Sequence, residues 1–204
     1  MLFLYDHLLA LIVGSVVILM LFMIQVRAQQ ENVEQAMINA AKKQTLELAD
    51  ALERDLANAG YATAPGQPGI TAYSMRADGV TDTLAFWGSD AAGTQIEVRY
   101  VVSVVDTVMI EGETLPLFEM QRFQRNGGPW VHDGGSPPTL THFSVTLLDE
   151  NNLVTGPVDV RKLQVRVTNA VFPHIGPDDY LRGYRQLHWG ITLTPSSLAD
   201  FQGG

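Results

Sequence analysis

The N-terminal hydrophobic pattern is that of one uninterrupted apolar helix. Residues 8–24 contain no charged residue, and apolar side chains would cover every face of a helix rather than a single stripe. A helix of residues 1–24 would be about 36 Å long, enough to cross a hydrocarbon core of about 30 Å. The apolar run is longer than the core of a secretory signal, and no Lys or Arg precedes it. We therefore expect residues 1–26 to be a retained helix that lies in a membrane or is sheathed by protein.

The helical pattern continues beyond this block but becomes amphipathic. Residues 27–59 contain neither Pro nor Gly, and apolar or small residues recur at steps of three and four. The stripe consists of Ala41, Thr45, Leu48, Leu52, Leu56 and Ala59. Gly60 is suited to end the helix, and the Pro and Gly residues of 65–69 prevent its continuation. Residues 27–60 are thus predicted to be an amphipathic helix whose Leu48, Leu52 and Leu56 face packs on a globular head.

From residue 61 to residue 204 the period changes to two, and β-branched and aromatic residues cluster. The predicted strands are 83–87, 95–105, 108–110, 115–124, 143–148, 160–168 and 186–194. Residues 111–113 are predicted to form a hairpin turn, and no second helix of useful length is expected. The predicted fold class is α+β, with a long N-terminal helix, apolar in its first half and amphipathic in its second, packed on a C-terminal antiparallel β-sheet head.

Charge and composition exclude several classes of function. The chain has a formal net charge of −9 and no cysteine. An acidic chain lacks the basic patch that nucleic-acid binding requires, so no nucleic-acid partner is expected. The absence of cysteine excludes disulfides, thiol nucleophiles and Cys-ligated metals. No phosphate-binding, dinucleotide-binding, zinc-protease or serine-hydrolase motif is present. We predict no catalytic residues, no cofactor, no metal site and no enzyme activity.

Two surface features remain as candidates for binding. Trp130, His132 and Asp133 lie between glycine- and proline-rich segments, which predicts a surface loop that either binds a partner or is simply solvated. Residues 149–152 and the pair Asp178 and Asp179 are rich in oxygen ligands. Neither has the spacing of a calcium loop, so ordinary turns are favoured. An enzyme with an acidic site at Asp178 and Asp179 is the most remote alternative.

A family resemblance covers nearly the whole chain. The helix ends in Asn58-Ala59-Gly60-Tyr61, and the segments 77–86, 98–101, 143–148 and 160–167 follow in order. The chain thereby resembles type IV pilins and pseudopilins, most closely the PilW-like minor pilins. The resemblance implies a structural subunit that waits in the inner membrane and is then assembled with copies of itself into an extracellular helical filament. Prepilin peptidase and a pilus assembly machinery are the partners that it implies.

The apolar helix departs from the family pattern at its start. The leader ending in Gly and the Glu at the fifth mature position are missing, but removal of Met1 would make Asp6 the fifth residue. Asp6 then either pairs with the terminal amine of a neighbouring subunit or marks a water-exposed helix end. The family's helix-breaking Pro is also absent, and Gly14 and Ser15 are its possible substitute. The residues expected to mediate assembly are Asp6, Leu8, Leu11, Gly14, Ser15, Ile18 and Phe22.

Two other functions stay open. One is a low-copy minor pilin or pseudopilin that primes a pilus or a type II secretion pseudopilus. The other is a bitopic envelope protein whose β head binds a ligand or partner. Arg27, Lys42 and Lys43 follow the apolar segment, and by the positive-inside rule they would place the head in the cytoplasm. This placement conflicts with an extracellular filament unless a basic leader was removed or the final location is not a bilayer.

Overall fold

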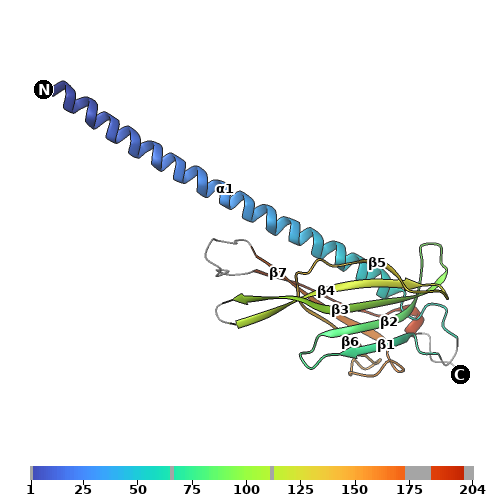
Figure 1. Cartoon of the computed structure of the whole chain (residues 1–204). Coiled ribbons are helices and arrows are strands. Elements are labelled where there is room, and N and C mark those ends of the chain that lie inside the picture. Colours follow the sequence, from blue (N-terminus) through green and yellow to red (C-terminus); the bar gives the residue numbers. More distant parts are fainter. Residues whose placement is uncertain (1, 65–66, 111–112, 173–184, 200–204) are drawn as a thin grey trace. The chain divides into compact units, whose positions relative to one another are not determined.

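A computed structural model describes residues 2–64, 67–110, 113–172 and 185–199. Helix α1 runs from Leu2 to Ala57 without a break (Figure 1), which confirms the long N-terminal helix predicted from the sequence. The helix continues through Gly14 and Ser15, where the Ser15 hydroxyl donates to the Ile12 carbonyl at 2.8 Å. The chain divides into two compact units, residues 1–40 and residues 41–204. The second unit, called the head below, therefore includes the last turns of α1.

The described part of the head contains eight strands and one further short helix. The strands are β1 (Ile70–Met75), β2 (Thr81–Ser89), β3 (Gln95–Ile110), β4 (Glu113–Arg125), β5 (Val131–Gly135), β6 (Leu140–Leu148), β7 (Lys162–Val171) and β8 (Arg185–Leu193). Helix α2 covers only Ser196–Ala199. All strand pairs are antiparallel, in the order β1-β2-β3-β4-β6-β7-β8, with β5 paired to β4. The α+β class with an antiparallel sheet is thus confirmed.

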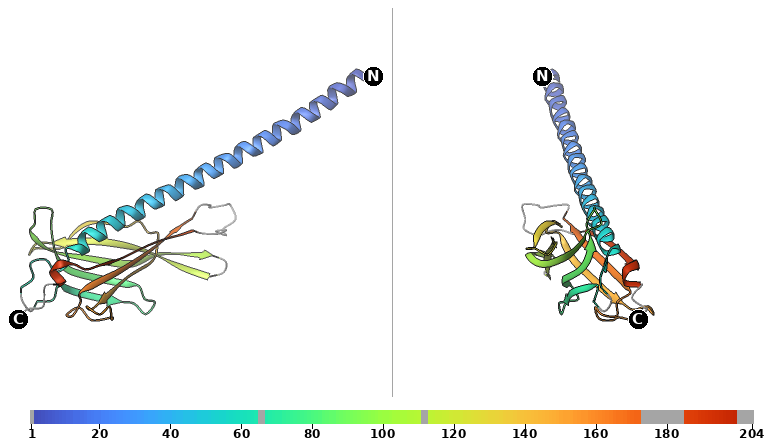
Figure 2. Two further views of the ribbon diagram at one scale, coloured as in Figure 1. Left: turned by 180° about the vertical axis from the view of Figure 1, so that it is seen from behind. Right: turned by 90° about the vertical axis from the view of Figure 1, so that its right-hand side faces the viewer.

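The strand predictions were incomplete in three places. Residues 95–110 form one long strand rather than two, and β3 and β4 extend beyond the neighbouring strands (Figures 1 and 2). Strand β1 was not predicted, because only Ile70 among its residues is buried and the alternation is therefore weak. Residues 131–135 form β5 instead of a loop, so the loop prediction for His132 and Asp133 was wrong. The predicted turn at residues 111–113 begins outside the described residues.

The sheet bends sharply between β4 and β6. These two strands share one paired position, Phe118 with Leu140, and the next part of the same edge of β4 pairs with β5. The sheet therefore has a first arm, β1 to β5, and a second arm, β6 to β8. Across the bend, the Tyr73 hydroxyl of β1 donates to the Val145 carbonyl of β6 at 2.7 Å. The arms thus enclose a core between their facing surfaces.

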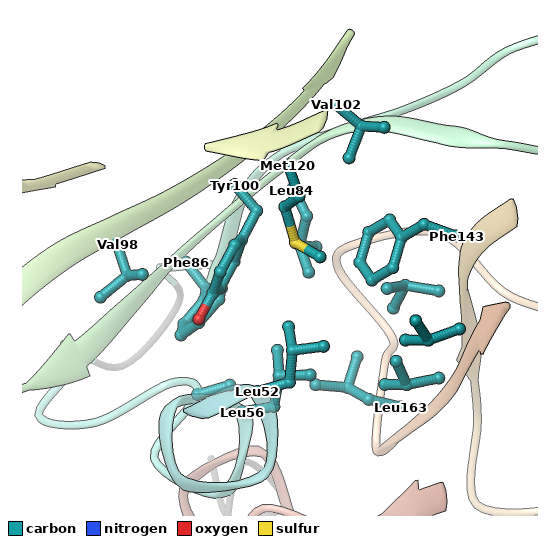
Figure 3. Close-up of a cluster of buried hydrophobic side chains, with 14 of the residues drawn as sticks. Leu52, Leu56, Leu84, Phe86, Val98, Tyr100, Val102, Met120, Phe143 and Leu163 are labelled. Carbon is teal, nitrogen blue, oxygen red and sulfur yellow. The ribbon is translucent and has the colours of Figure 1, made fainter. Parts of the chain in front are cut away.

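The amphipathic face of α1 contributes to this core. Leu52 and Leu56 are fully buried and Leu48 is nearly so, which matches the predicted helix–head contact. Figure 3 shows Leu52 and Leu56 between side chains of the first arm and side chains of the second. The labelled strand residues are Leu84, Phe86, Val98, Tyr100, Val102, Met120, Phe143 and Leu163. Burying a leucine side chain contributes about 1.5–3 kcal/mol, so these leucines hold the last turns of α1 firmly in the head.

The end of α1 requires glycine. Gly60 follows the last turn with φ of 84°, a conformation that other residues adopt at a cost, and its amide donates to the Trp87 carbonyl at 2.7 Å. A Cβ at this position would also lie 2.7 Å from a methyl carbon of Leu198 in α2. Gly60 therefore ends the helix as predicted and lets α2 close over that end of the core.

Candidate functional site

The first unit offers an apolar helix surface. In residues 3–24 the described large apolar side chains are exposed, including Leu8, Leu11, Ile18 and Phe22, and none of the most apolar 18-residue window is buried. The helix is long and apolar enough to cross a membrane, judged by length and composition. Exposed apolar surface of this extent is unfavourable in water. The segment is therefore compatible with membrane anchoring.

The predicted assembly residues lie in this helix with few contacts of their own. Space around Gly14 is open, since a Cβ there would meet no atom within 4 Å. Ser15 is exposed. Asp6 belongs to the first turns of α1, but its side chain lies outside the described part of the chain. The proposed pairing of Asp6 accordingly stays a prediction.

In the head, a groove lies between the last turns of α1 and the strands β3, β4 and β5. It has a volume of about 330 Å³, and its lining combines apolar groups with polar and charged side chains. The lining includes Glu47, Arg54, Tyr100, Arg122 and Asp133. Helix and strands thus bring together charged side chains that are far apart in the sequence.

A buried ion pair lies beside this groove, and one of its members, Arg122, belongs to the groove lining. Asp55 of α1 and Arg122 of β4 are joined by a hydrogen bond of 2.6 Å from Nε to Oδ2, and only 8% and 12% of the two side chains are exposed. The Tyr100 hydroxyl of β3 donates to the same Oδ2 atom at 2.6 Å. The other oxygen of Asp55 lies 3.7 Å from Nε of Arg54. Asp55 is thus surrounded by donors.

The protonation of this cluster is fixed by its surroundings. Burial raises the pKa of the Tyr100 phenol well above its ordinary value, and the negative charge and hydrogen bond of Asp55 raise it further. Burial alone lowers the pKa of the Arg122 guanidinium, but the hydrogen bond and charge of Asp55 outweigh burial, so this pKa is raised. Tyr100 is therefore a neutral donor and Arg122 a cation at neutral pH.

Strand β5 completes the cluster from the other side. Asp133 forms an ion pair with Nη1 of Arg122, and the same Nη1 contacts Oε1 of Gln124 at 3.4 Å. Arg122 consequently joins α1, β4 and β5, and it is paired with two carboxylates. This arrangement acts as a clamp that holds helix and strands together, rather than as a site with a spare acid, base or nucleophile.

Glycine permits the close approach of β5 to β4. A Cβ at Gly135 would overlap the carbonyl oxygen of Met120, and its φ of 158° borders the region that favours glycine. The next residue, Ser136, exchanges two hydrogen bonds with the Met120 main chain, at 2.7 and 3.0 Å. The Gly-rich segment that suggested a loop is thus a tight strand pairing.

The three residues of the predicted binding loop do not form one site. Asp133 lies on the helix side of the sheet with Arg122, whereas His132 lies on the opposite side, edge-on to Phe123 at 5.4 Å between ring centroids. Trp130 precedes β5 and stacks with the guanidinium groups of Arg99 and Arg125. Alternation along β5 separates Asp133 from His132 because successive side chains point to opposite faces.

The described residues contain no group of three or more His, Asp or Glu side chains placed to hold a metal ion. In the turn at 149–152, Oδ1 of Asp149 accepts from the amides of Asn151 and Leu153, both at 2.8 Å, which is ordinary turn chemistry. Asp178 and Asp179 lie outside the described residues, so the predictions made for them stay open.

Sequence reasoning missed the clamp itself. One signal was present, since Asp55 falls three residues after Leu52 and seven after Leu48, on the apolar stripe of the helix. A carboxylate on a core-facing stripe requires a buried partner. The identity of that partner, 67 residues later in the sequence, depends on strand pairing that the pattern did not provide.

Comparison of this chain with family models, with curated proteins and with solved structures found no match.

Proposed function

We infer that this protein is a structural subunit of the type IV pilin kind, which is anchored through α1 and assembles through it into a filament. The observation that supports this function is the exposure of apolar residues on all faces of the first turns of the same helix whose last turns form part of the head core. A helix apolar on every face needs lipid or neighbouring helices around it. In the proposed filament, copies of residues 1–26 replace lipid.

Assembly of this kind needs no enzyme chemistry. Each subunit would leave the inner membrane when its apolar helix moves from lipid to a bundle of identical helices, and the acidic heads would lie outside. When each subunit contacts the next head to tail and the rotation between them does not close a ring, the repeated contact produces a helical fibre. Within such a bundle the carboxylate of Asp6 requires a partner, because an unpaired charge in an apolar environment is costly.

Deletion of residues 1–26 tests the proposal. The truncated chain is expected to be soluble without detergent and monomeric by light scattering, and to form no fibres in electron micrographs. The full chain is expected in sheared extracellular material. Abundant filaments from the truncated chain would refute assembly through the helix. A full chain found only in the detergent-extracted membrane fraction would instead support a bitopic membrane protein.

A pair of single substitutions tests the role of Asp6. Asp6→Ala is expected to reduce the yield of sheared filaments, while His132→Ala, an exposed change on the head, is expected to leave it unchanged. Both variants should reach the membrane in amounts equal to the parent chain, as measured by immunoblot. Equal filament yields from the two variants would contradict a paired carboxylate.

A further inference from the structure

A second charged cluster lies on the face of the first arm that points away from α1. Tyr100 and Arg122 are paired across β3 and β4 and face the helix, so the neighbouring pair, Arg99 and Phe123, faces outward. The guanidinium carbon of Arg99 lies 4.2 Å from the ring centroid of Trp130 and 5.4 Å from that of Phe123. Arg99 is thus positioned by two aromatic rings.

The second arginine of this cluster already has an acidic partner. Arg125 contacts Oε2 of Glu97 through Nε and Nη2, both at 2.6 Å, and its guanidinium carbon lies 4.5 Å from the Trp130 centroid. The other oxygen of Glu97 accepts from the Thr71 hydroxyl at 2.7 Å. Both oxygens of the buried Glu97 are therefore occupied, and this carboxylate is not paired with Arg99.

Arg99 has no such partner. Among the residues that the structure describes, no carboxylate forms an ion pair with it and no group accepts a hydrogen bond from it. Its Nε is the one buried side-chain nitrogen or oxygen in that part of the chain without a hydrogen-bond partner. Its two terminal nitrogens are not among these buried atoms, so they are the donors that a group from solvent can reach.

The contacts of Arg99 with the two rings leave its terminal nitrogens able to donate hydrogen bonds. Contact with an aromatic ring uses the face of a guanidinium and leaves its N–H groups, which lie in the plane at the edge, able to donate. This edge matches the two oxygens of a carboxylate or phosphate. Arg99, Arg125 and Glu97 together carry a formal charge of +1 on an acidic head, which favours an anion at this place.

We propose that Arg99, supported by Trp130 and Phe123, binds an oxyanion group of a ligand, a carboxylate or a phosphate, on the outer face of the first arm. The ligand's oxygens accept hydrogen bonds from the two terminal nitrogens of the guanidinium, and the rings hold the guanidinium in place. This site is separate from the Asp55–Arg122 clamp and does not depend on the function proposed above.

The test uses the full chain in nonionic detergent at fixed salt, with glucuronate and glucose 6-phosphate as probes and glucose as the neutral control. Two-dimensional ¹H–¹⁵N spectra report the Arg Nε–H and Trp indole signals, which single substitutions assign. Saturable shifts of the Arg99 and Trp130 signals are expected with at least one anion and not with glucose. A response to glucuronate alone identifies a carboxylate site, and a response to glucose 6-phosphate alone identifies a phosphate site.

Two variants distinguish binding of an anion at Arg99 from nonspecific attraction of anions to the protein surface. Arg99→Gln is expected to weaken binding about tenfold or more, as loss of a charged hydrogen-bond donor should. Arg166→Gln, which alters an exposed arginine on β7, serves as the matched control and should leave affinity unchanged. Near-ultraviolet circular dichroism checks that both variants are folded. Absence of saturable shifts with both anions, or equal affinity in the folded Arg99→Gln variant, would overturn the proposal.

Discussion

Replacement of Arg122 by Met would leave the carboxylate of Asp55 buried without its main counterion. The two side chains are 8% and 12% exposed, so water replaces the lost contact poorly. Removing one partner of a buried ion pair typically lowers the free energy of unfolding by about 3–5 kcal/mol. Here the Tyr100 hydroxyl still donates to Asp55, and Arg54 lies 3.7 Å from its other oxygen. We therefore expect the lower end of that range, about 3 kcal/mol.

The complementary change distinguishes a charge left unpaired from a loss of packing. Asp55→Leu should cost less than Arg122→Met, because Arg122 keeps its contact with Asp133. The double variant, with Leu and Met together, should cost about 1 kcal/mol, since apolar residues of similar size often replace a buried pair with little loss. The interaction energy from the double-mutant cycle should therefore exceed about 2 kcal/mol.

The tryptophans provide the assay. All three, Trp87, Trp130 and Trp189, lie in the head and none in the apolar helix, so fluorescence during urea unfolding of the full chain in nonionic detergent reports the head alone. Lys43→Met is the matched control, because it breaks an exposed ion pair with Glu47 at 3.7 Å and should cost less than about 1 kcal/mol. The reasoning is refuted if Arg122→Met lowers the free energy of unfolding no more than this control does. It is also refuted if the losses caused by Arg122→Met and Asp55→Leu simply add in the double variant.

Two further outcomes follow from the same region. The pKa of the Tyr100 phenol is near 10.0 in the unfolded chain and higher in the head, so its contribution to stability is complete below pH 10 and declines above it by up to about 1.4 kcal/mol per pH unit. In urea unfolding between pH 9 and 11, the free energy of unfolding of Tyr100→Phe should therefore fall less steeply with pH than that of the parent chain. Equal falls in the two proteins would contradict the assignment. Gly135→Ala should destabilise the head by about 2 kcal/mol, because a Cβ there would overlap the Met120 carbonyl. Gly128→Ala, at a position with no atom within 4 Å of the added Cβ, should change the urea midpoint little, and equal shifts in the two variants would argue against tight pairing of β5 with β4.

The long helix and most of the sheet were predictable because their patterns are strong and local. The stripe that ends with Leu48, Leu52 and Leu56 has the helical period, and β7 alternates Leu163, Val165 and Val167 on its buried side. Strand β5 is exposed along its whole length, so it has no buried alternation to detect. Glycines that permit its close pairing with β4 are the same residues that usually indicate a turn.

The charged sites could not be predicted for a different reason. Asp55 and Arg122 meet only because β4 crosses the helix at one register, and a shift by one residue would turn Arg122 to the other face. Similarly, Arg99 and Trp130 are neighbours through the pairing of β3, β4 and β5. The sequence identified Trp130, His132 and Asp133 as notable residues, but their division between two faces required the observed register.

The place of α1 at the start of the chain has a consequence for synthesis. Leu52 leaves the ribosome well before Leu163 of β7, against which it finally packs in the core. At typical rates of about 5–20 residues per second, roughly 6–20 seconds pass between the two. During that interval the apolar stripe of α1 lacks its partners on β7 and β8. A membrane or chaperone that holds the nascent helix would therefore protect this chain from aggregation before its head can close.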